Sequence, residues 1–380
     1  MRLHYLSVSQ NFIPLLSVRV GGSELRFADI ADALSARGTE THLVVPATLR
    51  KQLARVRPAL PTNTVVLGEE GDSLANFLRI YALWVRRQRS GSHSFHYPLN
   101  CFPAIHAGLP HRVTCSYTDS IPIDQRTRSL QWQIWMRTLF WGAQQLDVLN
   151  PSVYRSLHEY FPQQAPKLSV TPSGTFINPD TYTVGTKVTD VVFASRLAPK
   201  IKGIEELLHL LPEVSKNLGD ILQEQMHFKV LGDGPLRDFV ASEIAHLRRE
   251  SVSVTYMGET DVRPIFSQAS VVLSLQTYNN YPSRVVAEGL LSGCFVIVRD
   301  TGESRLFGDL PGLIYVGDNL QAGEVASAIS SGYKRLRSDP GFSKEIRREA
   351  IRRFSCGDVL DYFQAMLCET RLNDGGPSSH

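Results

Sequence analysis

Long apolar runs and a strong charge imbalance are both missing from this chain. No uninterrupted apolar run approaches the roughly 18 residues that a membrane-spanning helix needs. Residues 1–9, MRLHYLSVS, have the pattern of a strand rather than of a signal peptide. Lys and Arg number 40 against 37 Asp and Glu, and a net charge of +3 does not favour nucleic acid as a partner. We therefore expect a cytoplasmic protein without a membrane span.

Metal-ligand and disulfide patterns are also missing. The sequence has no Asp-x-Asp pair of the kind that holds a divalent ion beside a diphosphate, so we expect no metal and no other cofactor. Its five cysteines are scattered without ligand spacing, which is typical of reduced and mostly buried thiols. They are Cys101, Cys115, Cys294, Cys356 and Cys368.

The 380 residues instead alternate between short apolar runs and segments of helical period, which predicts βαβ units and parallel sheets. This length favours two domains. The alternation stops in a polar stretch, so we place a hinge near 179–189. We predict α/β domains at 1–178 and 179–352 and a C-terminal helix within 353–372.

The expected elements include two long helices in the first half, at 73–89 and 125–145. Strands are expected at 3–7, 42–45, 64–67, 112–116, 148–149, 168–171, 190–194, 227–231, 252–256, 271–275 and 294–298.

The most informative segment is 276–302, QTYNNYPSRVVAEGLLSGCFVIVRDTG. It predicts a polar loop after a strand, a short helix from about Ser283 that contains Glu288, and then a strand and a second loop. Loops at the carboxyl ends of parallel strands line the ligand crevice of such sheets. Amide, hydroxyl and Arg side chains near a helix N-terminus suit a sugar or a nucleotide.

Two glycine turns precede helices. Gly21-Gly22 allows backbone to approach a ligand and the helix behind it offers free N–H groups to phosphate, although a plain tight turn is the alternative. The run Gly232-Asp233-Gly234 lacks the third glycine of a dinucleotide fingerprint, so we interpret it mainly as a strand-to-helix turn, with Pro235 at the start of the helix.

Two cations flank a Pro-containing loop at the start of the second half. Arg196 and Lys202 could neutralise a pyrophosphate, whose charge grows as a glycosidic bond breaks. The alternative is a pair of solvated surface cations, and Lys200 competes with Lys202 for the role.

In this order, the motifs resemble the retaining, nucleotide-sugar-dependent glycosyltransferases of the GT-B fold (glycosyltransferase family 4, glycosyl transferases group 1). The resemblance covers nearly the whole chain and is strongest over 191–302. It implies two Rossmann-like domains whose parallel sheets face each other across a cleft, with a C-terminal helix that crosses back to the first domain. It also implies hexosyl transfer from a nucleoside-diphosphate sugar to a glycan or lipid-linked acceptor, in cell-surface polysaccharide or glycolipid synthesis.

The resemblance also assigns residues. It places the Gly22 loop against the donor phosphates and sugar, Arg196 and Lys202 on the pyrophosphate, and Glu288 on the ribose. The implied donor-binding residues are Gly21, Gly22, Gly232, Asp233, Gly234, Asn279, Tyr281, Pro282, Ser283, Arg284 and Glu288. The catalytic candidates are Arg196, Lys202, Asn280, His96 and Asp119.

Three departures from the family pattern qualify these assignments. The first of two paired acids is absent, and its place falls to Asn280 by strict spacing or to Asn279 with one inserted residue. A histidine expected at the end of a strand is missing from 113–119, which leaves His96 and Asp119 as candidates. Arg196 and Lys202 stand one residue further apart than is usual.

One helix in the first half mixes basic and bulky apolar residues. A helical face of this kind either packs into the core or rests in a membrane interface, and a peripheral contact with the inner face of the membrane stays open. Its members are Arg126, Arg128, Trp132, Trp135, Met136, Arg137, Leu139, Phe140 and Trp141. Two functional alternatives also stay open: a nucleotide-sugar 2-epimerase and a non-catalytic nucleotide-sugar-binding subunit.

Overall fold

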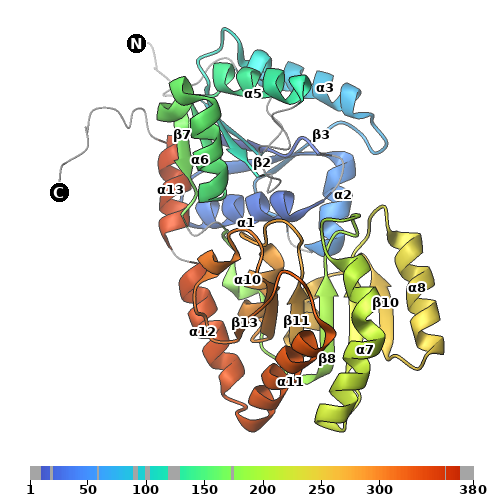
Figure 1. Cartoon of the computed structure of the whole chain (residues 1–380). Coiled ribbons are helices and arrows are strands. Elements are labelled where there is room, and N and C mark those ends of the chain that lie inside the picture. The colour runs from blue at the N-terminus through green and yellow to red at the C-terminus, as the bar shows by residue number, and fades with distance from the viewer. Residues whose placement is uncertain are drawn as a thin grey trace, which may run out of the picture.

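The computed structural model describes residues 10–17, 20–57, 60–88, 93–98, 103–118, 129–172, 175–355 and 357–368. They form two parallel sheets, one of seven and one of six strands, each with helices packed against it (Figure 1). All described strand pairs are parallel, so the carboxyl ends of the strands lie along one edge of each sheet. None of the described helices is both long and apolar enough to cross a membrane.

The first sheet has the strand order β3-β2-β1-β4-β5-β6-β7. Its strands are β1 (Asn11–Pro14), β2 (Thr41–Pro46), β3 (Thr64–Leu67), β4 (Ser94–Pro98), β5 (Arg112–Tyr117), β6 (Gln145–Val148) and β7 (Leu168–Val170). The helices between them are α1 (Gly22–Ala36), α2 (Ala47–Val56), α3 (Leu74–Arg87), η1 (Pro103–His106), α5 (Leu130–Gly142), α6 (Pro151–Tyr160) and η2 (Pro162–Lys167).

The second sheet has the order β10-β9-β8-β11-β12-β13, so the direction of winding reverses between β8 and β11. Its strands are β8 (Val188–Ala194), β9 (His227–Leu231), β10 (Val254–Gly258), β11 (Ala269–Ser274), β12 (Phe295–Arg299) and β13 (Leu313–Val316). Its helices are η3 (Pro179–Thr181), α7 (Ile204–Leu222), α8 (Arg237–Arg249), α9 (Val262–Gln268), α10 (Arg284–Leu291), η4 (Ser304–Phe307), α11 (Ala322–Ser338) and α12 (Phe342–Phe354).

The last described helix, α13 (Gly357–Cys368), returns to the first sheet. It packs against α1, β4 and β5, and the ring of Phe363 meets the ring of Phe27 edge to face at 5.8 Å between centroids. Val359, Phe363 and Leu367 are buried there with residues of α1 and β2. The predicted return of the C-terminal helix is therefore confirmed, as is the two-sheet α/β fold. The boundary at 178/179 stays a prediction, although each sheet lies wholly on its own side of it.

Several predicted elements differ from the structure. The strand expected at 3–7 lies outside the described residues, and the first described strand is Asn11–Pro14. The helix expected at 125–145 is shorter, since Ser129 accepts a hydrogen bond from the Trp132 N–H as its N-cap and Gln145 already belongs to β6. α2 was not predicted, because Pro46 looked like the end of a strand and is also the N-cap of the helix.

A chain of histidine and tyrosine side chains crosses the core under the first sheet. The carbonyl of Gln88 accepts from Nε2 of His111, so Nδ1 of His111 must accept from Nδ1 of His106, 3.1 Å away. Nε2 of His106 then accepts from the hydroxyl of Tyr97, which accepts from Tyr81. In this order Nδ1 of His111 and Nε2 of His106 both accept hydrogen bonds, so a further proton on either nitrogen would face a donor instead of an acceptor. Burial, with His111 nearby, lowers the pKa of His106 to about 3.

This arrangement predicts a loss of stability in mild acid. Unfolded histidines titrate near pH 6.5 and the folded His106 far below, so the unfolded state binds more protons as the pH falls. Stability is complete above about pH 6.5 and declines toward pH 3, by up to about 1.4 kcal/mol per pH unit for each such histidine. Urea unfolding between pH 5 and 7.5 measures the slope. The variant H106Q should flatten it and the exposed-site control H158Q should not; an unchanged slope in H106Q contradicts the assignment.

Candidate functional site

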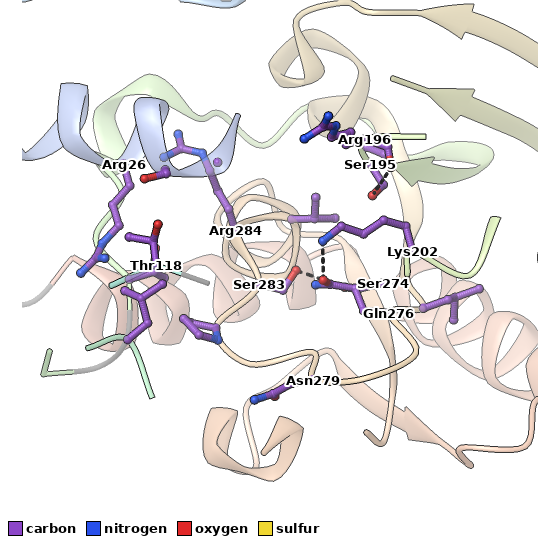
Figure 2. A pocket seen from close by; sticks show the side chains of 18 of the residues that line it. Arg26, Thr118, Ser195, Arg196, Lys202, Ser274, Gln276, Asn279, Ser283 and Arg284 are labelled. Atoms are coloured by element: carbon purple, nitrogen blue, oxygen red, sulfur yellow. Dashed lines mark hydrogen bonds between the residues drawn. The ribbon is translucent and has the colours of Figure 1, made fainter. Parts of the chain in front are cut away.

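A cavity of about 300 Å³ lies where the two sheets approach each other (Figure 2). Its walls come from the carboxyl ends of four strands and from the first turns of two helices, which is where open α/β sheets bind ligands. The lining residues are Gly22, Ser23 and Arg26 of α1; Thr118, Leu149 and Thr175 of loops in the first half; Phe193 to Arg196 and Lys202 after β8; Leu273 to Gln276 and Asn279 at and after β11; and Pro282 to Val285 at α10.

The cavity is strongly basic. Four cationic side chains line it, and the lining residues, all within the described part of the chain, include no Asp or Glu. Arg196 and Lys202 lie at one end and Arg26 at the other, with Arg284 between them (Figure 2). Nζ of Lys202 donates to Oε1 of Gln276. Such a surface favours a ligand with more than one negative charge.

The backbone adds to this polarity. α1 begins at Gly22 and α10 at Arg284, both at the cavity, and α7 begins directly after Lys202-Gly203. The first N–H groups of a helix have no partner within it and attract anions. Gly203 has a φ of +74°, and a Cβ there would stand 2.1 Å from the carbonyl oxygen of Leu275. Only glycine fits this approach of the α7 start to β11.

Arg284 connects the two halves of the molecule. Its Nη2 lies 2.9 Å from a carboxylate oxygen of Asp29 in α1, and its Nε donates to Oε1 of Glu288 at 2.6 Å. The Asp29 and Glu288 side chains are buried, and the Arg284 side chain is 14% exposed. Burial lowers the pKa of Arg284, but the two carboxylates outweigh it and raise that pKa well above its ordinary value. Arg284 is therefore a fixed cation whose position depends on both lobes of the molecule. We call the part built on the seven-stranded sheet the first lobe and the part built on the six-stranded sheet the second lobe.

Glu288 faces away from the larger cavity. It lines a smaller one of about 110 Å³, which Arg284 also lines. The same Oε1 atom that accepts from Arg284 accepts from the hydroxyl of Tyr182 at 2.6 Å. Arg196 and Lys202 thus share a cavity, whereas Glu288 lies in the neighbouring hollow behind Arg284.

The two asparagines have different surroundings. Asn279 lines the larger cavity, and its Oδ1 accepts from the N–H groups of Tyr281 and Glu303. Asn280 is fully buried: its Oδ1 accepts from Ser274 and Gln276, and its Nδ2 donates to two backbone carbonyls, of Ser274 and Arg299. The side chain nearer a ligand is therefore Asn279, and Asn280 braces the loop behind it.

Some of the other predicted donor-binding residues also line the cavity, whereas others point into the protein. Pro282 and Ser283 line the cavity, whereas Tyr281 turns inward and packs its ring against Phe307 at 5.0 Å. Gly21 is the N-cap of α1, and its N–H donates to the carboxylate of Glu24.

The second glycine turn also lies behind the site. Gly232, Asp233 and Gly234 are not among the residues that line either cavity. A Cβ on Gly232 would stand 1.8 Å from the carbonyl oxygen of Ser195, so the turn supports the loop that carries Arg196.

Of the two candidates in the first half, Asp119 lies outside the described residues. His96 is fully buried and does not line the cavity. Its ring nitrogens lie 2.8 Å from the Thr114 hydroxyl and 2.9 Å from the Ser116 hydroxyl, and burial, with Arg26 nearby, lowers its pKa to about 3. Thr118, which directly precedes Asp119 in the sequence, does line the cavity.

Sequence reasoning missed Arg26, Thr118, Asp29 and Tyr182. A charged residue among the apolar residues of a helix that faces the core was the available signal for Arg26 and Asp29. No local pattern marks Thr118 or Tyr182, since their neighbours come from distant segments.

Comparison with known proteins gives the kind of enzyme. Residues 188–334, less than half of the chain, match the family described as Glycosyl transferases group 1. The protein is a glycosyltransferase. This matched region carries Arg196, Lys202, Arg284 and Glu288. A search of curated proteins returned no match.

Several solved glycosyltransferases share the whole fold. Anabaena Alr3699/HepE, in complex with UDP and glucose, has 15% identity and a TM-score of 0.71, over 93% of this chain and 98% of that chain. A variant of S. aureus TarM, in complex with fondaparinux, α-GlcNAc-glycerol and UDP, has 10% identity and a TM-score of 0.70, over 95% and 100%. The pneumococcal O-GlcNAc transferase GtfA, with UDP and GlcNAc, has 12% identity and a TM-score of 0.67, over 94% and 98%. This glycosyltransferase has the GT-B fold.

The different surroundings of the asparagines predict different effects of an introduced acid. In N280D, one carboxylate oxygen replaces an amide that donates to two carbonyls, and a buried unpaired charge costs about 3–5 kcal/mol. In N279D the acceptor Oδ1 is retained, so we expect a loss below about 1 kcal/mol. Thermal unfolding of the two variants measures the difference. Equal destabilisation would contradict these placements.

Proposed function

We propose that this glycosyltransferase transfers a sugar, with retention of anomeric configuration, from a nucleoside-diphosphate sugar to a glycan or lipid-linked acceptor in the synthesis of a cell-surface polysaccharide or glycolipid. The observation that carries the proposal is the basic cavity between the sheets, with four cations and no acid among its lining residues. A diphosphate is the part of such a donor that needs positive charge beside it, both in the ground state and as the bond to the sugar breaks.

The donor fits the two cavities in one orientation. Its diphosphate would lie against Arg196 and Lys202, near the start of α10, and its sugar would point toward the first sheet. Its nucleoside would extend toward the smaller cavity, where Glu288 would accept hydrogen bonds from the ribose hydroxyls. This placement requires Glu288 to exchange its contact with Tyr182 or Arg284 for the ribose. The bound UDP and glucose of the similar Anabaena protein support a donor of this class.

We propose that no metal ion is needed. Guanidinium and ammonium groups at Arg196 and Lys202, with helix N-termini beside them, supply positive charge that a divalent ion supplies in other transferases. Asn279, rather than a carboxylate, would contact the transferred sugar, because Asn280 is enclosed by the protein.

A nucleotide-sugar epimerase is less compatible with this site. That chemistry needs a carboxylate or an imidazole that can exchange protons with the sugar, whereas the described residues that line the larger cavity include no Asp, Glu or His. A non-catalytic subunit would share the donor site but lack turnover, which the following experiment decides.

Turnover is measured as release of nucleoside diphosphate from UDP- and GDP-sugars with mixed glycan and lipid-phosphate acceptors. We expect release with at least one donor, undiminished by EDTA. The variants R196A and K202A should each lower kcat by about 10²-fold or more, since each removes charge that faces the leaving group. The control R305M, an exposed Arg over the ring of Tyr315, should retain full activity. Tight donor binding without any release would favour the non-catalytic subunit.

We also propose that the first lobe rests on the anionic inner face of the membrane. α3 and α5 both contact η1, at the end of the molecule away from the second sheet (Figure 1). Their exposed sides mix apolar and basic residues, and neither helix contains Asp or Glu. The exposed side chains include Leu74, Leu83, Leu130, Ile134 and Trp141, with Arg79, Arg86, Arg87 and Arg137. Such a surface combines burial in the headgroup region with attraction to anionic lipid.

Co-sedimentation with vesicles tests this contact. We expect binding to vesicles that contain phosphatidylglycerol and weak binding to pure phosphatidylcholine. The double variant I134S/W141S should reduce binding about tenfold or more, because two large side chains leave the interface. L306S, at an exposed Leu of the second lobe, is the matched control. The proposed membrane contact would be refuted if I134S/W141S bound as well as L306S, or if the wild type bound both kinds of vesicle equally.

A further inference from the structure

Arg26 has unused hydrogen-bonding capacity. It lines the larger cavity, yet it is only 3% exposed. Its guanidinium lies over the rings of Phe27 and Phe363, at 5.2 and 5.5 Å from their centroids, and its Nη2 donates to the Thr171 hydroxyl at 3.1 Å. Nε and Nη1 are buried and have no hydrogen-bond partner in the described structure. Two N–H groups of this buried cation can therefore still donate a hydrogen bond to a ligand.

Among the described residues, no carboxylate pairs directly with Arg26. The acid nearest in the network is Asp147, but Thr171 stands between it and Arg26. The two carboxylate oxygens of Asp147 already accept from the hydroxyls of Ser116, Thr171 and Tyr362. Burial lowers the pKa of Arg26. A cation that is buried without a direct partner is costly, and a bound anion would remove that cost.

The donor does not account for Arg26 either. In the proposed function Arg196 and Lys202 balance the diphosphate, and Arg284 is already paired with Asp29 and Glu288. Arg26 lies at the opposite end of the cavity from Arg196 and Lys202 (Figure 2), and Thr118 lines the same cavity. It belongs to the first lobe, which presents the acceptor in the proposed reaction. Its charge is therefore available to a second anion.

We infer that Arg26, with the hydroxyls of Ser23 and Thr118, binds a negatively charged group, a carboxylate or a phosphate, on the acceptor sugar. Oγ of Ser23 is a second buried polar atom in the cavity without a partner in the described structure. The inference rests on the proposed function, since it takes the donor to occupy the other end. It narrows the acceptor class to acidic sugars, such as uronic acids and sugar phosphates.

Binding in the presence of saturating UDP tests the subsite, because UDP fills the donor end. The probes are glucose 6-phosphate, methyl β-glucuronide and neutral methyl β-glucoside, titrated by calorimetry. We expect at least one acidic probe to bind and the neutral glucoside not to. R26M should weaken acidic-probe binding about 10- to 100-fold, the effect of losing charge-assisted hydrogen bonds, and leave UDP affinity unchanged. R26K should restore part of it, and R305M should match the wild type.

The Tm and the UDP affinity of R26M distinguish a binding role of Arg26 from a structural one. Because R26M replaces an unpaired buried cation by an apolar chain between two aromatic rings, we expect its Tm to stay equal or rise. A lower Tm with unchanged probe binding would give Arg26 a purely structural role and overturn the inference. Weaker UDP binding in R26M would place Arg26 in the donor site and overturn it too.

The two proposals can fail separately. If the wild type does not bind UDP, the donor assignment fails, and the acidic probes are then titrated into the free protein. Binding that R26M abolishes would still support the anion subsite, and binding that R26M leaves intact, or no binding at all, would refute it.

Discussion

The ion pairs of Arg284 are the contacts on which the site depends. One guanidinium meets Asp29 from α1 of the first lobe and Glu288 from its own helix in the second. Asp29 and Glu288 are buried and Arg284 is mostly buried, so removing one partner would leave an uncompensated charge, which in fully buried pairs costs about 3–5 kcal/mol. The pairs therefore favour one arrangement of α1 against α10, and residues of both helices line the larger cavity.

That arrangement gives the cavity its polarity. The acids near the site are turned toward cations: Glu288 to Arg284, and Asp29 to Arg284 and Arg57. Beside apolar side chains, the lining residues, all described, offer positive side chains, hydroxyls, amides and helix N-termini, and no acid. An anionic ligand then replaces water at groups that are already oriented, which is the condition for stabilising a charged leaving group. The cavity has one basic end at Arg196 and Lys202 and another at Arg26 (Figure 2). In the proposed function the donor uses only the first.

Much of this could be predicted from the sequence, because it depends on local patterns. Five of the six strands after the hinge and the start of the short helix at Ser283-Arg284 follow from short apolar runs and turn residues, whereas β13 was not predicted. Family motifs pointed to Arg196 and Lys202, and the structure brings both cations to one cavity. What could not be predicted depends on contacts between distant segments. Spacing alone could not show that Asn280 faces inward while Asn279 faces the cavity, or that Glu288 is held by Tyr182 and Arg284.

A structure of the protein bound to a nucleoside diphosphate tests the central claim most directly. The account predicts both phosphates in the cavity between the lobes, within hydrogen-bond distance of Arg196 and Lys202, with the ribose turned toward Glu288. A diphosphate bound on another surface, with those two side chains left facing solvent, would contradict it.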